Sequence, residues 1–160
     1  MTGSSASGAG GWVLLSYRIP REPSTPRITI WRKLKRLGVA QLGDGLVALP
    51  ADARTREQLE WIAEEVVEAG GTATIWLAQP ATRAQERELA QAMAEARAAE
   101  YGAIVAEARR PSGDVRRTVR RLRAELRRIG RRDYFPPPER DAAHAAVDAL
   151  AARQDKESTA

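Results

Sequence analysis

A turn in the middle of the first eighty residues constrains the fold of this chain more than any other feature. Asp44-Gly45 separates two short apolar runs within residues 39–50, and both residue types tolerate the positive φ angles that a tight hairpin turn requires. We therefore expect two adjacent antiparallel strands there. The apolar run 12–20, closed by Pro20, predicts a strand before this hairpin, and the β-branched run 72–79 predicts a strand after it.

Two amphipathic segments lie on either side of the hairpin. Residues 27–37 carry apolar side chains at spacings of three and four and are followed by Gly38, which predicts a helix. Residues 56–69 show the same period, with Thr55 as the expected N-cap and Gly70-Gly71 as the end. The order is thus β-α-β-β-α-β, which predicts an α+β, ferredoxin-like sheet with two helices on one face.

The composition changes after Pro80. Residues 82–108 are rich in Ala, Glu and Arg and predict a long helix; Asp114 is the expected N-cap of a second helix over 115–129, and 139–153 predicts a short third one. These helices predict a C-terminal helical appendage packed on the sheet domain. The predicted organisation is a disordered tail over 1–11, a ferredoxin-like domain over 12–80, a helical extension over 81–153 and a disordered tail over 154–160.

Positive charge is concentrated in the second of these helices. The chain carries a formal net charge of +5, whereas residues 109–132 alone hold arginines opposed only by Asp114 and Glu125. A localised cationic block suits a polyanion, and guanidinium groups bind phosphate oxygens in pairs of hydrogen bonds. The sequence therefore predicts a DNA contact by the arginines around the apolar seam of this helix: Arg116, Arg117, Arg120, Arg121, Arg123, Arg127 and Arg128.

Two other interpretations of the arginines stay open. They are solvated, or they pair with the acidic residues of the preceding helix, which extend from Glu86 to Glu107. The helix over 27–37 is a weaker second candidate for contact with nucleic acid, through its exposed basic residues Arg32, Lys33, Lys35 and Arg36.

Catalytic patterns are scarce in this sequence. His144 is the single histidine and lies in an Ala-rich stretch, where a surface or packing role is the simpler interpretation. One histidine and no cysteine argue against a zinc site, and no P-loop or dinucleotide-binding glycine motif occurs. We therefore expect no enzyme, no metal and no cofactor. No apolar run approaches membrane-spanning length and residues 1–11 lack the pattern of a signal peptide, so the expected location is the cytoplasm.

The four tryptophans each fall on an apolar position of an expected strand or helix. We therefore predict that Trp12, Trp31, Trp61 and Trp76 belong to the core. The alternative is a platform on which bases stack, which requires the rings to be exposed on the open face of the sheet.

Five segments, taken in order, resemble a known family. They are similar to the N-terminal domain of the chromate-resistance regulator ChrB, over roughly residues 12–153: Trp12-Val-Leu-Leu-Ser-Tyr-Arg-Ile-Pro, Trp31-Arg-Lys-Leu-Lys-Arg-Leu-Gly, Leu42-Gly-Asp-Gly-Leu-Val-Ala-Leu-Pro, Arg97-Ala-Ala-Glu-Tyr101 and Arg132-Asp-Tyr-Phe-Pro136. The resemblance implies a transcriptional regulator of chromate-efflux genes, with this domain as its DNA-contacting part.

The strand, basic helix and hairpin are also similar, more distantly, to the middle domain of PaaX-type repressors and to the small CRISPR-associated nuclease of ferredoxin-like fold. In that nuclease an Asp at the end of the first strand serves metal-dependent cleavage. The matching position here carries Arg18, so the resemblance does not transfer the activity.

These observations lead to two expectations about function. The first is a DNA-binding transcriptional regulator associated with chromate resistance, with DNA as its partner and with a homodimer formed through the sheet edge or the helical appendage. The second is a protein-interaction module that forms half of a split regulator or docks an acidic partner, and that does not itself bind DNA. A separate sensor-domain protein is then the expected partner.

Overall fold

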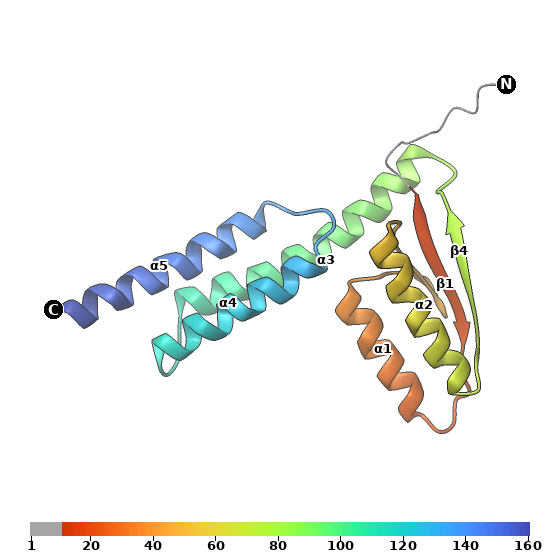
Figure 1. Cartoon of the computed structure of the whole chain (residues 1–160). Helices are drawn as coiled ribbons and strands as arrows, with labels where there is room; N and C mark the ends of the chain where they lie inside the picture. The colour runs from red at the N-terminus through yellow and green to blue at the C-terminus, as the bar shows by residue number, and fades with distance from the viewer. Residues whose placement is uncertain (1–10) are drawn as a thin grey trace. The chain divides into compact units, whose positions relative to one another are not determined.

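The computed structural model describes residues 11–160, which fall into two compact units, the first ending at Leu89 and the second beginning at Ala90 (Figure 1). The elements in chain order are β1 (Trp12–Arg18), α1 (Thr25–Leu37), β2 (Ala40–Gly43), β3 (Leu46–Pro50), α2 (Ala53–Glu68), β4 (Thr72–Ala78), α3 (Arg83–Arg109), α4 (Val115–Arg131) and α5 (Glu139–Thr159). The expected N-terminal tail lies outside the described residues, apart from Gly11.

The first unit is a four-stranded antiparallel sheet with two helices. Its strand order is β2-β3-β1-β4, so that the first strand lies inside the sheet and pairs with both β3 and β4. Helices α1 and α2 cover the same face of this sheet (Figure 1). The predicted α+β class, the element order and the hairpin at Asp44-Gly45 are confirmed.

Alternation along β1 decides which side chains form the core of this unit. Val13 and Leu15 are fully buried, and they lie opposite Leu49 and Val47 of β3, which are also buried. The helices contribute the apolar faces that the sequence period predicted: Ile30, Leu34, Leu59, Ile62 and Val66. Burial of these side chains at about 1.5–3 kcal/mol each is the main term that holds the helices on the sheet.

The start of α2 differs from the sequence prediction. Asp52, rather than Thr55, is the N-cap, and its carboxylate accepts a hydrogen bond from the Thr55 amide at 2.7 Å. Thr55 occupies the third helical position, where its hydroxyl accepts from the Asp52 amide and donates to the Pro50 carbonyl at 2.6 Å. Thr55 is fully buried, so this capping box also joins α2 to the end of β3.

The second unit is built from the rest of α3 together with α4 and α5. These helices share one cluster of buried residues: Tyr101, Ile104, Ala108, Val119, Leu122, Leu126, Ile129, Ala143, Val147 and Leu150. The unit boundary falls between Leu89 and Ala90, about two turns into α3, rather than at Pro80 where the composition changes. The first turns of this long helix therefore belong to the sheet unit.

Helix α5 extends further than predicted. It continues to Thr159, through residues for which the sequence predicts a disordered tail. The added residues include good helix formers, and the Ser158 and Thr159 hydroxyls donate hydrogen bonds to the carbonyls of Gln154 and Asp155, at 3.0 and 2.8 Å. The Thr159 hydroxyl also donates to the Lys156 carbonyl at 3.3 Å, one of the carbonyls at the end of the helix that lack a backbone partner.

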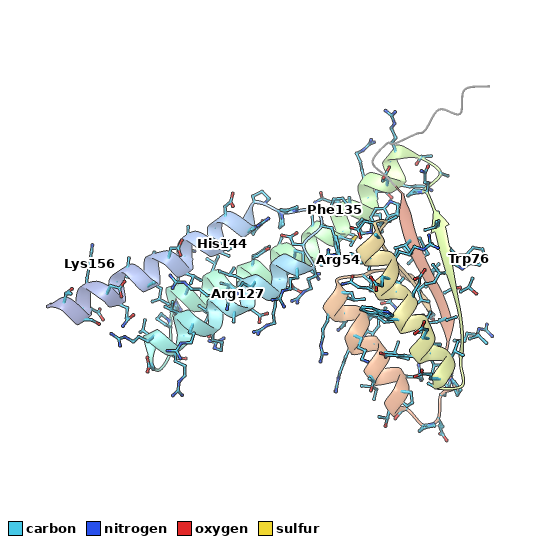
Figure 2. All side chains as sticks on the ribbon, viewed as in Figure 1. Arg54, Trp76, Arg127, Phe135, His144 and Lys156 are labelled. Carbon is cyan, nitrogen blue, oxygen red and sulfur yellow. The ribbon has the colours of Figure 1, made fainter. Side chains whose placement is uncertain are left out.

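The tryptophans divide between core and surface. Trp12 is buried and Trp31 is half-buried, but Trp61 is 57% exposed and Trp76 is 54% exposed, so the core prediction is wrong for these two. Trp76 lies on β4 (Figure 2), opposite Leu14, on the sheet face away from α1 and α2. Its ring nitrogen donates to the Ser16 hydroxyl at 2.9 Å. The spacing of apolar residues identifies the apolar face of a segment, but it does not show whether another element packs on that face.

Among the described residues, no helix combines the length and the apolar character needed to cross a membrane.

Candidate nucleic-acid interface

Helix α4 presents its arginines because its apolar side is used by the core. Asp114 caps the helix as predicted, and its carboxylate accepts from the amides of Arg116 and Arg117 at 2.9 and 3.3 Å. Val119, Leu122, Leu126 and Ile129 face inward at spacings of three and four, and they are all buried. Eight of the remaining positions of the helix are arginines, and all eight are exposed.

Five arginines form a single stripe along α4, here called the arginine row: Arg116, Arg120, Arg123, Arg127 and Arg131. Their spacings of three and four place them on one face of a helix, along the flank that adjoins the apolar seam on the side of α5. All five are exposed. Within residues 11–160, only Arg123 has an acidic partner, the exposed Asp148 at 3.7 Å. The row extends over about 22 Å at 1.5 Å per residue.

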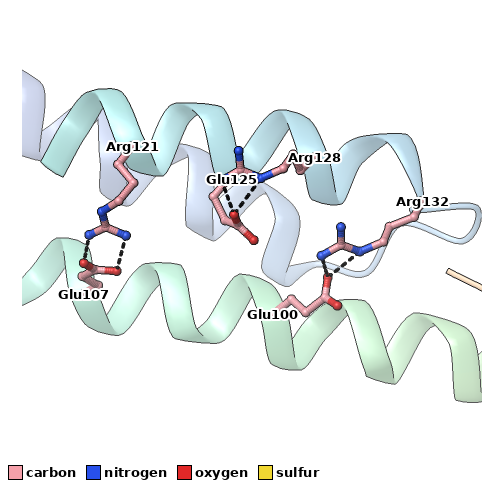
Figure 3. Close-up of polar contacts among 6 residues, drawn as sticks. All are labelled: Glu100, Glu107, Arg121, Glu125, Arg128 and Arg132. Atoms are coloured by element: carbon pink, nitrogen blue, oxygen red, sulfur yellow. Dashed lines mark hydrogen bonds and ion pairs between the residues drawn. The ribbon is translucent and has the colours of Figure 1, made fainter. Parts of the chain in front are cut away.

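The other predicted arginines are partly neutralised within the chain (Figure 3). Arg121 forms an ion pair with Glu107 of α3, and Arg128 pairs with Glu125 of its own helix at 2.6 Å. Arg132, just beyond α4, pairs with Glu100 at 2.9 Å. Arg117 is also exposed. The prediction that the arginines pair with the acidic helix therefore holds for Arg121, while the arginine row stays outside these contacts.

A groove between α4 and α5 continues the positive surface. It has a volume of about 540 Å³ and is lined by three arginines of the row together with Arg140, His144 and Asp148 of α5. Arg127 and His144 are labelled on these two helices in Figure 2. Sequence reasoning missed Arg131, although the period from Arg127 indicated it. It also missed Arg140, because the pairing of α4 with α5 has no local signal.

The second predicted basic surface, on α1, is smaller than expected. Arg32, Lys35 and Arg36 are exposed, and the Lys35 ammonium lies 5.3 Å from the centroid of the Trp31 ring. Lys33 is half-buried and forms an ion pair with Glu65 of α2 at 2.6 Å. Lys33 therefore joins the two helices of the first unit, which leaves three of the four residues oriented toward solvent.

Two segments that are far apart in the sequence meet in a polar network at the C-terminal end of α4. The Tyr101 hydroxyl donates to a carboxylate oxygen of Asp133 at 2.8 Å, and the Arg97 guanidinium donates to the Arg132 carbonyl at 3.4 Å. Arg132 in turn donates to Glu100. This network connects α3 to the residues that follow α4. The sequence of residues 132–136 predicts only a connector between two helices, so it does not predict these contacts.

This network leads to a prediction about alkaline pH. Burial, followed by the hydrogen bond to Asp133, raises the pKa of Tyr101 well above the ordinary value of 10.0. Because the folded protein prefers the neutral phenol, the network contributes its full stability below pH 10 and loses it as the pH rises further, by up to about 1.4 kcal/mol per pH unit. Replacing Tyr101 with Phe is expected to cost about 1–3 kcal/mol at pH 7, since it leaves a half-buried carboxylate without its donor.

The measurement is urea unfolding of both proteins between pH 7 and pH 11. The Tyr101→Phe variant is expected to show a shallower loss of stability above pH 10 than the parent chain. Equal alkaline slopes would contradict the assignment to Tyr101. Tyr17, whose pKa burial also raises, is the matched second phenol, and Tyr17→Phe tests whether it contributes to the slope.

The fold and this surface together define a class: a basic α+β protein in which a sheet unit is followed by an arginine-striped helical unit. The chain belongs to the family described as protein ChrB, N-terminal, whose model matches residues 27–121, more than half of the chain. Protein ChrB of Cupriavidus metallidurans is 34% identical over 77 residues, which cover 48% of this chain and 24% of that relative. The chain therefore matches about a quarter of the relative's length. No solved structure matches the chain.

Proposed function

We propose that this protein is a DNA-binding transcriptional regulator associated with chromate resistance and that the arginine row binds the phosphate backbone. The single observation that carries the proposal is the row itself: five exposed arginines on one helix face, four of them without an acidic partner among residues 11–160. Membership of the ChrB N-terminal family supports the regulatory role, because the resemblance implies a regulator of chromate-efflux genes.

Charge and geometry both favour this interface. A row of guanidinium groups about 22 Å long can neutralise several phosphates, and each neutralised phosphate releases a counterion. The groove between α4 and α5 adds Arg140 to the same surface. The ion pairs at Arg121 and Arg128 are exposed, and each contributes no more than about 1 kcal/mol to stability. Breaking them so that these arginines contact DNA would therefore cost little.

Two finer assignments accompany this proposal. We assign the first unit to the ferredoxin-like class, which its βαββαβ element order and its two helices on one face support. We also propose that the regulator acts as a homodimer, the commonest assembly of soluble oligomers and the one by which helical DNA-binding proteins contact two half-sites. A measurement of molar mass in solution with and without DNA tests the dimer.

The test of DNA binding is a gel shift with duplex DNA from upstream of the gene, at two salt concentrations. The variant Arg116→Gln/Arg120→Gln/Arg127→Gln is expected to weaken binding by at least tenfold at low salt. It is also expected to reduce the slope of log K against log salt by about 2.7, since each phosphate that the arginines no longer neutralise lowers the slope by about 0.9. The matched control, Arg54→Gln/Arg83→Gln/Arg87→Gln, removes the same charge from exposed positions of the first unit.

The control separates a specific surface from general charge. It is expected to keep both the affinity and the salt slope within error. If both variants lost the same affinity, binding would depend on net charge alone, and the assignment of the interface to α4 would be wrong. Absence of a shift with the parent chain, even at a low salt concentration of about 50 mM, would overturn DNA binding itself.

A protein-interaction module is the second candidate, and an apolar groove in the first unit favours it. Trp12, Leu14, Leu42, Pro80 and Leu89 line this groove of about 520 Å³, and Leu42 is exposed. A separate sensor-domain protein is the proposed occupant. Its purified form should bind the parent chain and lose affinity for Leu42→Asp, without any gel shift of DNA; binding that is insensitive to Leu42→Asp would exclude this surface.

A further inference from the structure

A second cavity of the first unit lies where β1 ends and α1 begins. It has a volume of about 960 Å³, within the range of small-molecule sites, and its walls come from three segments: the end of β1 with the following loop, the first turns of α1 and the tip of the β2–β3 hairpin. The Tyr17 amide donates to the Gly45 carbonyl at 2.8 Å, which holds the hairpin tip against β1. A backbone hydrogen bond therefore fixes one wall of the cavity, which we call the β1 cleft.

The β1 cleft carries an excess of positive charge. Arg18, Arg21 and Arg27 line it, and none of the three has an ion pair or a side-chain hydrogen bond within residues 11–160. Asp44 is the one acidic residue in its lining. An arginine without a carboxylate partner is free to bind an anion through two parallel hydrogen bonds. The balance of three guanidinium groups against one carboxylate matches a ligand with two negative charges.

The remaining walls supply a hydroxyl, a helix start and an aromatic ring. Tyr17 lines the cleft, and its phenol is protonated at neutral pH, so its hydroxyl can donate a hydrogen bond. Ser24 precedes α1, and its side chain makes no capping hydrogen bond, which leaves its hydroxyl and the amides of Thr25 and Arg27 open to a ligand, since Pro26 has no N–H. Trp31 lines the same cleft and is half-buried. Aromatic rings at such positions stack on planar groups.

We propose that the β1 cleft binds a small phosphate monoester that carries a planar ring, of which a nucleoside monophosphate is the representative. The phosphate lies among Arg18, Arg21 and Arg27 near the start of α1, and the ring stacks on Trp31. A phosphate monoester is a dianion near neutral pH, which matches the charge of the cleft. This site is distinct from the arginine row, so it adds a ligand-binding function to the proposed regulator.

The first test is calorimetric titration of the full chain with adenosine and guanosine monophosphates. Arg18→Ala and Arg27→Ala are each expected to weaken binding by about tenfold or more, as the loss of a charge-assisted hydrogen bond does. Arg54→Ala is the matched control, because Arg54 is an exposed arginine at the start of α2, outside the cleft (Figure 2). It is expected to bind with unchanged affinity, and thermal melting checks that all three variants are folded.

A change of opposite sign makes the test more specific. Replacing Asp44 with Asn removes the one negative charge from the lining and is expected to tighten nucleotide binding by about threefold or more. A destabilised variant would bind less tightly, so a gain in affinity cannot come from unfolding. Unchanged or weaker binding by folded Asp44→Asn would contradict the placement of the phosphate in the cleft that Asp44 lines.

Two further probes identify the ligand class. Nucleotide addition is expected to quench tryptophan fluorescence in the parent chain, and Trp31→Phe should abolish the change while binding persists. Adenosine and inorganic phosphate are each expected to bind at least tenfold more weakly than the monophosphate; equal binding of either would overturn the two-part site. Loss of DNA binding in Arg18→Ala would instead make the cleft part of the nucleic-acid interface, whereas the proposal expects a normal gel shift.

Discussion

Replacing Leu122 with Ala is expected to destabilise the second unit by about 2–5 kcal/mol, the cost of a large-to-small change in a packed helical core. Leu122 is 1% exposed and lies at the centre of the apolar seam of α4, within the cluster shared by α3, α4 and α5. Because the seam directs the arginine row outward, partial unfolding here also weakens the proposed contact with DNA. Urea unfolding followed by circular dichroism, together with the gel shift, measures both effects.

The same substitution at Leu77 is the control. Leu77 is 64% exposed, so Leu77→Ala is expected to change the free energy of unfolding by less than about 0.5 kcal/mol. Similar costs at the two positions would mean that the cluster of the second unit is not a closely packed core. A stable Leu122→Ala variant with weakened DNA binding would also contradict this expectation, since it would separate the seam from stability.

Replacing Gly71 with Ala is expected to cost about 3 kcal/mol or more in the first unit. An added Cβ would overlap the Arg18 carbonyl oxygen and would lie 2.9 Å from Cγ1 and 3.1 Å from the carbonyl oxygen of Val66. Two of these neighbours are backbone atoms that cannot move without shifting β1 or α2, which makes the overpacking severe. Gly71 thus permits the chain to turn from α2 into β4 at close range to the end of β1.

A glycine in open surroundings is the control for this prediction. Gly102 lies inside α3, and a Cβ there meets no atom within 4 Å. Gly102→Ala is expected to stabilise the protein by about 0.5–1 kcal/mol, because alanine loses less backbone entropy in a helix. Thermal melts of both variants test whether the two substitutions change the stability in opposite directions. A Gly71→Ala protein as stable as the parent would exclude the close approach of Gly71 to Arg18.

Local patterns were sufficient to predict the elements of this protein. Asp44-Gly45 predicted the hairpin because few residues accept the φ of +69° that Gly45 adopts. Asp114 predicted the start of α4 because its short carboxylate reaches the first amides of the helix. The spacing of the apolar seam predicted which side of α4 is buried. Each of these depends on residues within about one turn of one another.

The candidate sites needed the tertiary structure. The sequence shows eleven arginines in residues 109–132 but not which of them are neutralised, since Arg121 meets Glu107 from a different helix. The β1 cleft joins Arg18, Arg27 and Asp44 from three segments, and no spacing in the chain brings them together. Trp61 and Trp76 occupy positions of an apolar spacing yet are exposed, because the spacing identifies an apolar face but not whether another element packs on it.

By itself, the sequence determined the α+β class, the order of strands and helices and the concentration of positive charge in α4, because turns, caps and helical periods act over a few residues. Only the tertiary structure decided that five arginines form an open row, that Arg121 pairs with Glu107, and that an arginine-lined cavity lies at the end of β1. The physical reason is that charge pairing and cavity formation depend on distances between elements, which packing of the buried side chains sets.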